Sequence, residues 1–521
     1  MIAFVCPLKR MPRTFQRFDY LVPENINAQV GDFVEVPFRN KKLTGVVIGL
    51  SKESIVPGLR PILKILDFPS LTKEEVDYAL SLSKSLYQSP STIFFLGTPF
   101  IRRKQVKKNN AMSVNRQWSI KKYEAEESAK ILKLLMKDDN SIAVSGDRIS
   151  IASAVLYWKK HRRAMLVFVP DLNMLKSVAV AFPENARVLT WSGKSTLGDA
   201  YSAWYAIRTE EKRVVIATRV ASYTLPSPAL KVIVIDSGND DYFEQEQNPY
   251  VDVRRAIVLA GSYSGFSISR LCVMPRVEDK PLTDDLWNSG DVKIVDLHST
   301  MRTSQSIFIS DNLISAIRDN PPVDSPWILY FNRLSGDGYK AEDIKQALDE
   351  SLREFKSQIL SAENDIPKEG IAISTKTFFH KIDILSPKIS GIAILNADRE
   401  FILRGFRTME RATGTIRRLV SIARSAGVPC IIQTFDTNTI KKMLSSTKEI
   451  YDNELSARKL LGYPPYKDIV IKSVSGAKVE VRKTKYFEPI EEWLTTTHCA
   501  DIITNPDRYD FAHFDPSKPK S

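Results

Sequence analysis

A loop that could hold nucleotide phosphates lies at residues 143–153, at the end of the first apolar segment of an α/β pattern. Phosphate-binding loops are rich in glycine and end in Lys followed by Ser or Thr, because backbone N–H groups and the ammonium group neutralise the phosphates. Here Gly146 stands alone, and Ala152 precedes Ser153 where the lysine is needed. Loss of that charge-assisted contact predicts no working phosphate loop. Gly146 and Ser153 could still offer backbone and hydroxyl contacts, so weak ATP binding stays open.

Two further groups of residues were considered for metal chemistry. Asp236 ends an apolar segment, as a magnesium-binding acid would, but Ser237 follows it in place of a glutamate that could activate water. We interpret Asp236 as a turn residue at the end of a strand. The four cysteines include no Cys-x-x-Cys pair, and His380, like His161 and His298, has no partner at ligand spacing. The sequence therefore predicts no metal site.

Basic charge is concentrated at the start of the chain. Lys and Arg number 74 against 61 Asp and Glu, a net charge of +13. Residues 1–110 hold 17 basic and 9 acidic residues, a net of +8, so about a fifth of the chain carries over half of the excess. A concentrated basic field attracts polyanions, and this pattern favours nucleic acid as a partner over a merely soluble basic surface.

Length and composition indicate several globular domains. The chain has 521 residues, of which 43% are hydrophobic and 26% charged, as in ordinary globular proteins. No apolar run approaches the ~20 residues that span a bilayer, and the first six residues are too short for a signal peptide. Four cysteines suit a reducing compartment. We expect a cytoplasmic protein without membrane segments.

Periodicity places these residues on elements of two kinds. Residues 31–37 and 42–50 are short, β-branched and bounded by turn residues, which predicts strands, and residues 71–87 predict a helix capped by Thr72 or Ser70. From residue 118 onward, short apolar runs alternate with helical stretches, notably 341–363 and 408–426, which is typical of parallel sheets covered on both faces. The predicted strands are 165–169, 187–190, 213–217 and 231–236, then 292–297, 327–331, 370–374, 391–395 and 430–435.

Motifs in this order resemble the PriA family of replication-restart helicases. The N-terminal matches are Phe18-Asp-Tyr-Leu-Val-Pro23, Gly31-Asp-x-Val-x-Val-Pro-Phe38, Leu43-Thr-Gly-Val-Val47 and Leu59-Arg-Pro-Ile62. Later matches are Ala217-Thr-Arg-Val-Ala221, Phe331-Asn-Arg333, Gly338-Tyr339, Leu395-Asn-Ala-Asp398, Glu410-Arg411 and Glu454-Leu-x-x-Arg-Lys-Leu-Leu-Gly-Tyr-Pro-Pro-Tyr466. The resemblance implies an α/β protein, in which a β-rich N-terminal DNA-end-binding domain precedes two tandem RecA-like helicase lobes.

The resemblance also implies domain boundaries and DNA-binding residues. We expect a 3′ DNA-end-binding domain at 1–105, a basic linker at 106–117, lobe one at 118–280, lobe two without the zinc insertion at 281–475, and a truncated C-terminal region at 476–521. The last residues are expected to form a frayed tail. The family's end pocket implies DNA contacts from Phe18, Asp19 and Tyr20, with Arg60 in place of a lysine and Arg39 in place of a small residue. Lys41, Lys42 and residues 102–108 are expected to contact the DNA backbone.

Departures from the family pattern decide the expected activity. The chain lacks the family's phosphate-loop lysine and its Asp-Glu-Glu-His box, which would begin at Asp236. Residues 418–425 replace the arginine-finger motif, and the eight zinc cysteines are absent. The sequence thus predicts a degenerate member, similar to actinobacterial forms, that has no cofactor and lacks helicase activity, while other enzyme activity stays open. It would bind forked or branched DNA at a 3′ end, near the nucleoid, with primosome proteins and single-stranded DNA-binding protein as further partners. Two alternatives stay open, an active ATP-dependent 3′-5′ helicase that uses unorthodox residues, and a protein–protein scaffold.

Overall fold

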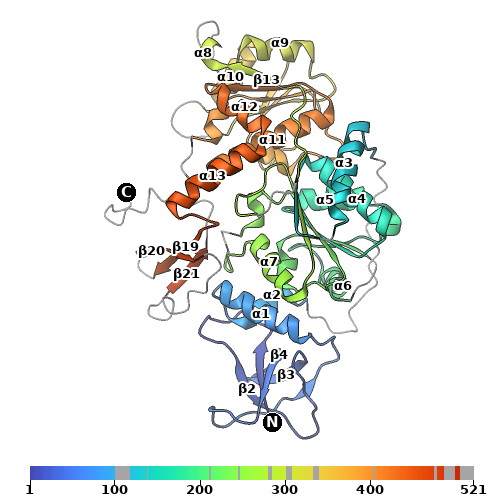
Figure 1. The fold of residues 1–521 in the computed structure, drawn as a ribbon, viewed down its shortest axis with the longest axis vertical. Helices are drawn as coiled ribbons and strands as arrows, with labels where there is room; N and C mark the ends of the chain where they lie inside the picture. Colours follow the sequence, from blue (N-terminus) through green and yellow to red (C-terminus); the bar gives the residue numbers. More distant parts are fainter. Residues whose placement is uncertain are drawn as a thin grey trace.

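The computed structural model arranges the chain as three stacked parts and a small side sheet (Figure 1). It describes residues 1–99, 118–137, 139–209, 213–244, 247–279, 284–300, 308–332, 340–402, 405–474, 478–485 and 499–504. The N-terminal β domain lies at one end, one α/β unit lies in the middle, and a second α/β unit lies at the other end. Within these ranges, no helix is long and apolar enough to cross a membrane. The predicted linker at 106–117 and the terminal tail lie outside the described residues.

The N-terminal part is a five-stranded antiparallel sheet in the order β2-β1-β4-β3-β5. Its core is built from alternate, mostly β-branched side chains such as Val5, Val34 and Val36. Two helices follow, and the first begins at Thr72, whose side chain forms a capping box with Glu75. The elements are β1 (Ile2–Pro7), β2 (Phe18–Leu21), β3 (Phe33–Phe38), β4 (Lys41–Ser51), β5 (Lys64–Ile65), α1 (Lys73–Ser85) and α2 (Pro90–Gly97).

Helices α1 and α2 join this domain to the middle unit. The Tyr78 hydroxyl donates to the Ser222 carbonyl oxygen at 2.5 Å, and Arg208 Nη2 donates to Glu75 Oε2 at 2.7 Å. Phe68, just before α1, stacks on Trp204 at 5.2 Å between ring centroids. The β domain is therefore seated on the middle unit through buried contacts.

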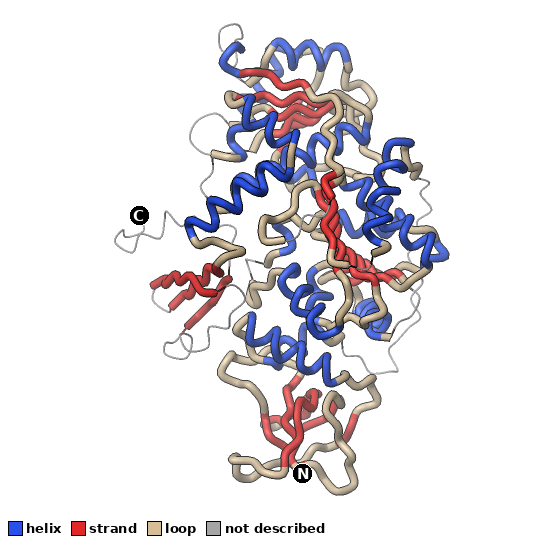
Figure 2. The backbone as a smooth tube through the Cα atoms, in the orientation of Figure 1, coloured by secondary structure: helices blue, strands red, loops and turns tan. Residues whose placement is uncertain are grey.

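The middle unit, lobe 1 (residues 118–285), is a parallel sheet in the order β12-β6-β11-β10-β7-β9-β8. Its five inner strands, from β6 to β9 in the sheet order, are fully buried, as expected of a sheet covered on both faces by helices (Figure 2). The elements are α3 (Lys122–Leu135), β6 (Ser141–Val144), α4 (Asp147–His161), β7 (Met165–Phe168), α5 (Leu172–Ala181), η2 (Glu184–Ala186), β8 (Leu189–Trp191), α6 (Leu197–Arg208), β9 (Val214–Ala217), η3 (Arg219–Tyr223), β10 (Lys231–Ile235), η4 (Asp240–Tyr242), α7 (Val253–Ser264), β11 (Ile268–Cys272) and β12 (Asp284–Asp285).

Lobe 2 (residues 293–461) repeats this topology. Its sheet order is β13-β18-β17-β14-β16-β15, so in both lobes the first strand neighbours the sixth and the second lies between the fifth and fourth. The elements are β13 (Lys293–Asp296), α8 (Leu297–Thr300), α9 (Asp311–Asp319), β14 (Trp327–Tyr330), α10 (Ala341–Ser351), β15 (Ser357–Ile359), β16 (Ile371–Ser374), η5 (Lys376–His380), β17 (Gly391–Ile394), η6 (Ala397–Glu400), α11 (Thr408–Ala426), β18 (Cys430–Thr434), α12 (Thr437–Ser445) and α13 (Thr447–Leu461). The repeated order confirms two tandem RecA-like lobes after a β-rich domain.

The lobes share one apolar core. Met165 and Ile216 of lobe 1 belong to the same buried cluster as Ile416 and Leu419 of α11, with Met274 between them. Helix α11 is the element that crosses this junction, and its predicted bounds are those observed. The packing of α11 on lobe 1 determines the shape of the cleft that separates the two lobes.

One prediction of secondary structure was wrong. The helix expected over 341–363 ends at Ser351, and Ser357–Ile359 forms β15 on the edge of β16. Apolar residues at 344, 348, 352, 355 and 359 keep a helical spacing, but the open edge of β16 offers backbone partners that override it. The C-terminal region, expected as a truncated segment at 476–521, includes β20 (Lys478–Lys485) and β21 (Cys499–Thr504), which form an antiparallel sheet with the preceding β19 (Lys467–Val474). Asp468 of that sheet pairs with Arg255 of α7 at 2.6 Å.

Candidate functional site

Aromatic rings gather at the β2 edge of the N-terminal sheet. Phe18 stacks on Phe15 with ring centroids 5.7 Å apart, and its ring meets Phe38 edge-on at 5.3 Å. Phe15 is 44% exposed, while Phe18 and Phe38 are half-buried. A ring cluster that reaches solvent in this way can stack on a terminal base.

Asp19 lies next to Phe18 but faces another environment, because neighbouring side chains on a strand point to opposite faces. Its Oδ2 accepts a hydrogen bond from the Ser54 hydroxyl at 2.5 Å, and its Oδ1 lies 3.6 Å from Arg17 Nε. The carboxylate is 7% exposed. The sequence predicted Asp19 as a DNA contact, and the structure adds Ser54 and Arg17 as partners that sequence reasoning missed.

The predicted basic residues lie around the β3–β4 hairpin. Arg39 and the next residue form the two-residue turn between the paired Phe38 and Lys41, and Arg39 adopts φ 52, as such turns require. Arg60 Nη1 donates to the Arg39 carbonyl oxygen at 3.0 Å. Lys41 is exposed, and Lys42 Nζ lies 3.7 Å from a Glu35 carboxylate oxygen. Through Phe38, the structure brings Phe18, Arg39 and Arg60 to one end of the sheet.

Tyr20 has a different place from the one expected. It is 5% exposed, its hydroxyl donates to the Pro37 carbonyl oxygen at 3.0 Å, and burial raises its pKa. The Tyr20 ring thus belongs to the core of the β domain, and its contact with DNA stays a prediction. Residues 102–108, predicted to contact phosphates, lie outside the described residues.

The phosphate-loop position lies between β6 and α4, where Gly146 caps the helix. A helix N-terminus here would normally face phosphate, since its N–H groups and dipole favour an anion. In this chain the first helical residue, Asp147, supplies its own carboxylate and is 2% exposed. Helix α11 packs directly on the loop, because a Cβ placed on Gly146 would lie 2.1 Å from Ser421 Oγ. The anion position is occupied by protein groups.

Arg418 of α11 holds this arrangement together. Its Nε donates to Asp147 Oδ2 at 2.9 Å, and its Nη1 lies 3.4 Å from Asp236 Oδ2. Arg418 is 6% exposed, and the two carboxylates hold the pKa of its guanidinium above the ordinary value against the effect of burial. Burial raises the pKa of Asp236 to about 7, opposed by Arg418. The sequence located Arg418 in the broken arginine motif but gave no sign of these partners, which come from lobe 1.

The other nucleotide-site remnants divide into two groups. Asp236 and Asp147, the residue that follows Gly146, meet at Arg418. Ser153 is fully buried and its hydroxyl donates to the Ile149 carbonyl oxygen of its own helix at 2.7 Å. Asp236 has φ 55 and accepts a hydrogen bond from Asn239 Nδ2 at 2.7 Å, which fits the predicted turn at a strand end. The structure leaves Ser153 away from the cleft.

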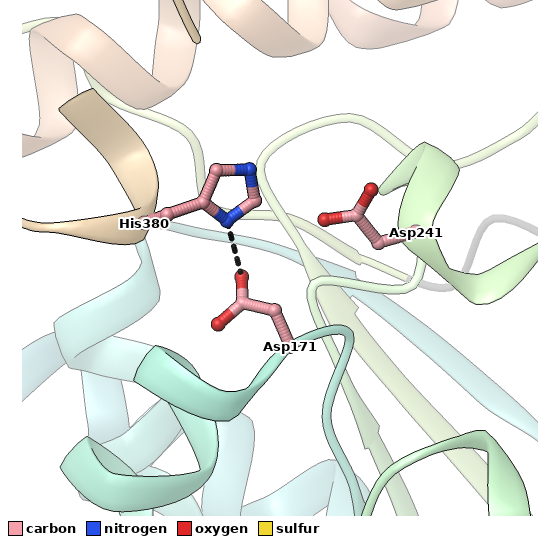
Figure 3. Close-up of side chains that lie close together, drawn as sticks. All are labelled: Asp171, Asp241 and His380. Carbon is pink, nitrogen blue, oxygen red and sulfur yellow. Dashed lines mark ion pairs between the residues drawn. The ribbon is translucent and has the colours of Figure 1, made fainter. Parts of the chain in front are cut away.

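Beside Arg418, two adjoining cavities of about 560 and 410 Å³ follow the cleft between the lobes. Both are lined by Asp240, Asp241 and His380. The larger one also contacts Lys194 and Arg219, and Asp171 reaches it from the start of α5. Figure 3 shows that His380 and the carboxylates of Asp171 and Asp241 lie close together, although sequence spacing had paired His380 with nothing.

A second set of buried charges ties α11 and α13 to lobe 1. Glu278 accepts from Arg407 at 2.7 Å and from Arg458 at 3.2 Å, and Arg458 Nη2 also donates to Glu410 at 3.0 Å. The arginines lower the pKa of Glu278 to about 2. Glu410 and Arg458, which belong to the matched motifs, thus act structurally at the lobe junction.

Comparisons with known proteins agree with this architecture. Residues 5–99 match the family model of the PriA 3′ DNA-binding domain. The chain is 24% identical over 339 residues to the replication restart protein PriA of Rickettsia conorii, covering 60% of this chain and 51% of that protein. It is 21% identical over 549 residues to the replication restart protein PriA of Borreliella burgdorferi, covering 85% and 81%. The chain spans about half the length of the Rickettsia relatives it matches.

Among solved structures, Mycobacterium smegmatis helicase Lhr bound to ssDNA and AMP-PNP aligns with a TM-score of 0.36 and 12% identity, over 63% of this chain and 48% of that chain. The family model and the curated relatives confirm the resemblance found in the sequence. With a match to the PriA 3′ DNA-binding domain at residues 5–99 and two RecA-like lobes behind it, the chain is similar to the replication restart proteins PriA of Rickettsia and Borreliella.

Proposed function

We propose that this protein binds forked or branched DNA through a free 3′ end, and that it serves replication restart without ATP-driven unwinding. The match of residues 5–99 to the PriA 3′ DNA-binding domain carries the DNA-end part of the proposal. The contacts of Arg418 with Asp147 and Asp236 support the absence of ATP-driven unwinding. We place the protein at the nucleoid in the cytoplasm.

The DNA-end part is supported by the chemistry at the β2 edge. Phe18 lies among rings that reach solvent and can stack on the terminal base, a contact worth about 1–3 kcal/mol. Asp19 can accept a hydrogen bond from a terminal hydroxyl and would repel a 3′-phosphate. Arg39, Lys41 and Arg60 surround the rings with charge that neutralises the DNA backbone.

Three features of the nucleotide-site position support the absence of a working motor. Phosphoryl transfer is catalysed by positioning and by neutralising charge on the phosphates. Ala152 provides no ammonium, and Asp147 brings a negative charge to the helix end where phosphate would lie. Arg418, the cation that contacts Asp147, is already paired with two carboxylates. A nucleotide would have to displace this ion pair before it could bind.

The test compares two forked DNAs that differ only in a 3′-hydroxyl or a 3′-phosphate end, by fluorescence anisotropy without nucleotide. We expect tighter binding of the hydroxyl fork, and Asp19→Ala should abolish the preference while keeping most of the salt-dependent affinity. The matched control is Glu24→Ala, an exposed carboxylate of the same domain. If roughly four to six phosphates are neutralised, log K falls with log salt at a slope of about −3 to −5. Equal binding of both ends by the wild type would remove the end-recognition claim.

Other proteins of the restart machinery are the further partners that we propose. Primosome proteins and single-stranded DNA-binding protein meet the same forks, and a factor without a motor needs another protein to open the duplex. Co-sedimentation on forked DNA with and without each partner measures this directly. If one of these proteins does not join the complex, the proposed interaction with that protein is wrong, and the other proposed interactions are unaffected.

A further inference from the structure

Three side chains in the interlobe cleft have the donor set and spacing of a metal site. Asp171, Asp241 and His380 each offer one ligand atom, and these atoms all lie within 4.8 Å of one another. Asp171 stands at the start of α5, Asp241 in η4 and His380 at the end of η5, so two come from lobe 1 and one from lobe 2 (Figure 3).

The separation of His380 from Asp171 fits a shared ion better than a direct hydrogen bond. Nδ1 of His380 lies 3.6 Å from Oδ2 of Asp171, beyond the usual 2.7–3.2 Å range of an N–H···O bond. Two ligands at ~2.1 Å from a tetrahedral ion are roughly 3.4 Å apart. The ring nitrogen and the carboxylate oxygen therefore already stand at about the distance that a zinc ion imposes.

The carboxylates are held by second contacts that leave ligand atoms available. Asp171 Oδ1 accepts from the Met174 backbone N–H at 2.8 Å, which fixes the carboxylate at the helix start. Its Oδ2 is buried and, among the described residues, has no hydrogen-bond partner. The backbone N–H of Asp241 donates to Asn239 Oδ1 at 2.9 Å and anchors the turn that carries this carboxylate. Such outer contacts orient the ligands of metal sites.

Charge in the cleft also favours a cation at this point. Among the nearby basic residues, Arg219 pairs with Glu244 at 2.5 Å and Arg411 with Asp240 at 2.7 Å, while Lys194 also lines the larger cavity. Asp171 and Asp241 are left facing each other across the same cavity, and a divalent ion would neutralise both charges. Nitrogen and oxygen donors with an open side are typical of Zn²⁺.

We propose that Asp171, Asp241 and His380 bind one Zn²⁺ ion, with its fourth position open to the larger cavity, and that this ion fastens lobe 1 to lobe 2. This differs from the sequence prediction of no metal site, which considered only spacing along the chain. The residues are separated by 70 and 139 positions, and only the fold brings them together. The proposal does not depend on DNA binding or on the state of the nucleotide site.

The test uses the full chain stripped of metal with a chelator and titrated with ZnCl₂ by calorimetry. We expect one equivalent bound by the wild type, and a loss of affinity of at least about tenfold in His380→Ala and in Asp241→Asn. The matched control is His161→Ala, an exposed histidine of lobe 1 outside the cleft, which should bind like the wild type. His380 is half-exposed, with 51% of its side chain accessible, so its removal is compatible with folding, and circular dichroism checks this.

Titration with Co²⁺ adds a spectroscopic readout, because a site with few ligands gives visible absorption bands that should vanish in His380→Ala. Absence of Zn²⁺ binding in the wild type would overturn the proposal and leave a direct His380–Asp171 ion pair. Equal binding by the wild type and His380→Ala, or loss of binding in His161→Ala, would likewise overturn it, since the ion would then lie elsewhere.

Discussion

Replacement of Arg418 by methionine tests the contact that closes the nucleotide site. Methionine keeps an unbranched apolar stem but removes the guanidinium that contacts Asp147 and Asp236. Removing one partner of a buried ion pair typically costs about 3–5 kcal/mol, because the other charge is left buried and unpaired. Since the pKa of Asp236 is already raised to about 7, this residue can take up a proton, and we expect a cost near 3 kcal/mol at neutral pH.

Amide hydrogen exchange is the suitable assay, because a single unfolding free energy is not well defined for a protein of several domains. A loss of about 3 kcal/mol corresponds to exchange that is roughly two orders of magnitude faster in α4 and α11. The control is Arg424→Met on the same helix, whose pair with Glu127 is more exposed and should change protection little.

A second variant separates charge from packing. In Asp147→Asn combined with Arg418→Met, opposite charges are removed together, and most of the lost protection should return. If Arg418→Met exchanged as slowly as the wild type, the ion pair would not hold the lobes together. The inference that this ion pair occupies the nucleotide site would then be wrong.

Three further outcomes are expected. The pKa of Glu278 is lowered to about 2 from 4.5, so its ion pairs contribute about 3 kcal/mol of stability that is fully present above pH ~4.5 and is lost as the pH falls toward 2. Glu278→Gln should therefore make the melting temperature depend less on pH on the acid side. An unchanged pH dependence would contradict this. Ser54→Ala frees Oδ2 of Asp19 and should strengthen the preference for a 3′-hydroxyl fork in anisotropy, whereas a lost preference would mean that Ser54 positions the carboxylate. Lys41→Ala should weaken binding to both forks equally and make the salt slope shallower by about 1, and a change confined to one fork would show that Lys41 reads the end.

Local sequence signals predicted most of the elements well. Residues 408–426 show a helical spacing of buried side chains, and α11 has these bounds. Thr72, one of two expected caps, forms the capping box of α1 with Glu75. The short apolar runs became the parallel strands because burial on both faces leaves little other choice for such segments. Where the local pattern fitted two structures, as at residues 355–359, the neighbouring strand β16 decided the outcome.

The sites were less predictable, because their contacts join distant parts of the chain. Arg418 and Asp147 are 271 residues apart, and nothing in either segment marks the pairing. The meeting of His380 with Asp171 and Asp241 depends on how lobe 2 packs against lobe 1. Tyr20 shows the opposite case, since the resemblance placed it at the DNA while its hydroxyl bonds to Pro37 within the core. The absent lysine at Ala152 was visible in the sequence, but the ion pair that occupies the site was not.

The central claim is that this PriA-like chain binds forked DNA without a working motor. Its most direct test is the steady-state rate of ATP hydrolysis by the wild-type protein with Mg²⁺ and a saturating fork that ends in a 3′-hydroxyl. We predict no hydrolysis above the rate of a protein-free blank, while anisotropy on the same sample shows the fork fully bound. Turnover on the order of 1 per second, within the usual range of enzymes, would contradict the account.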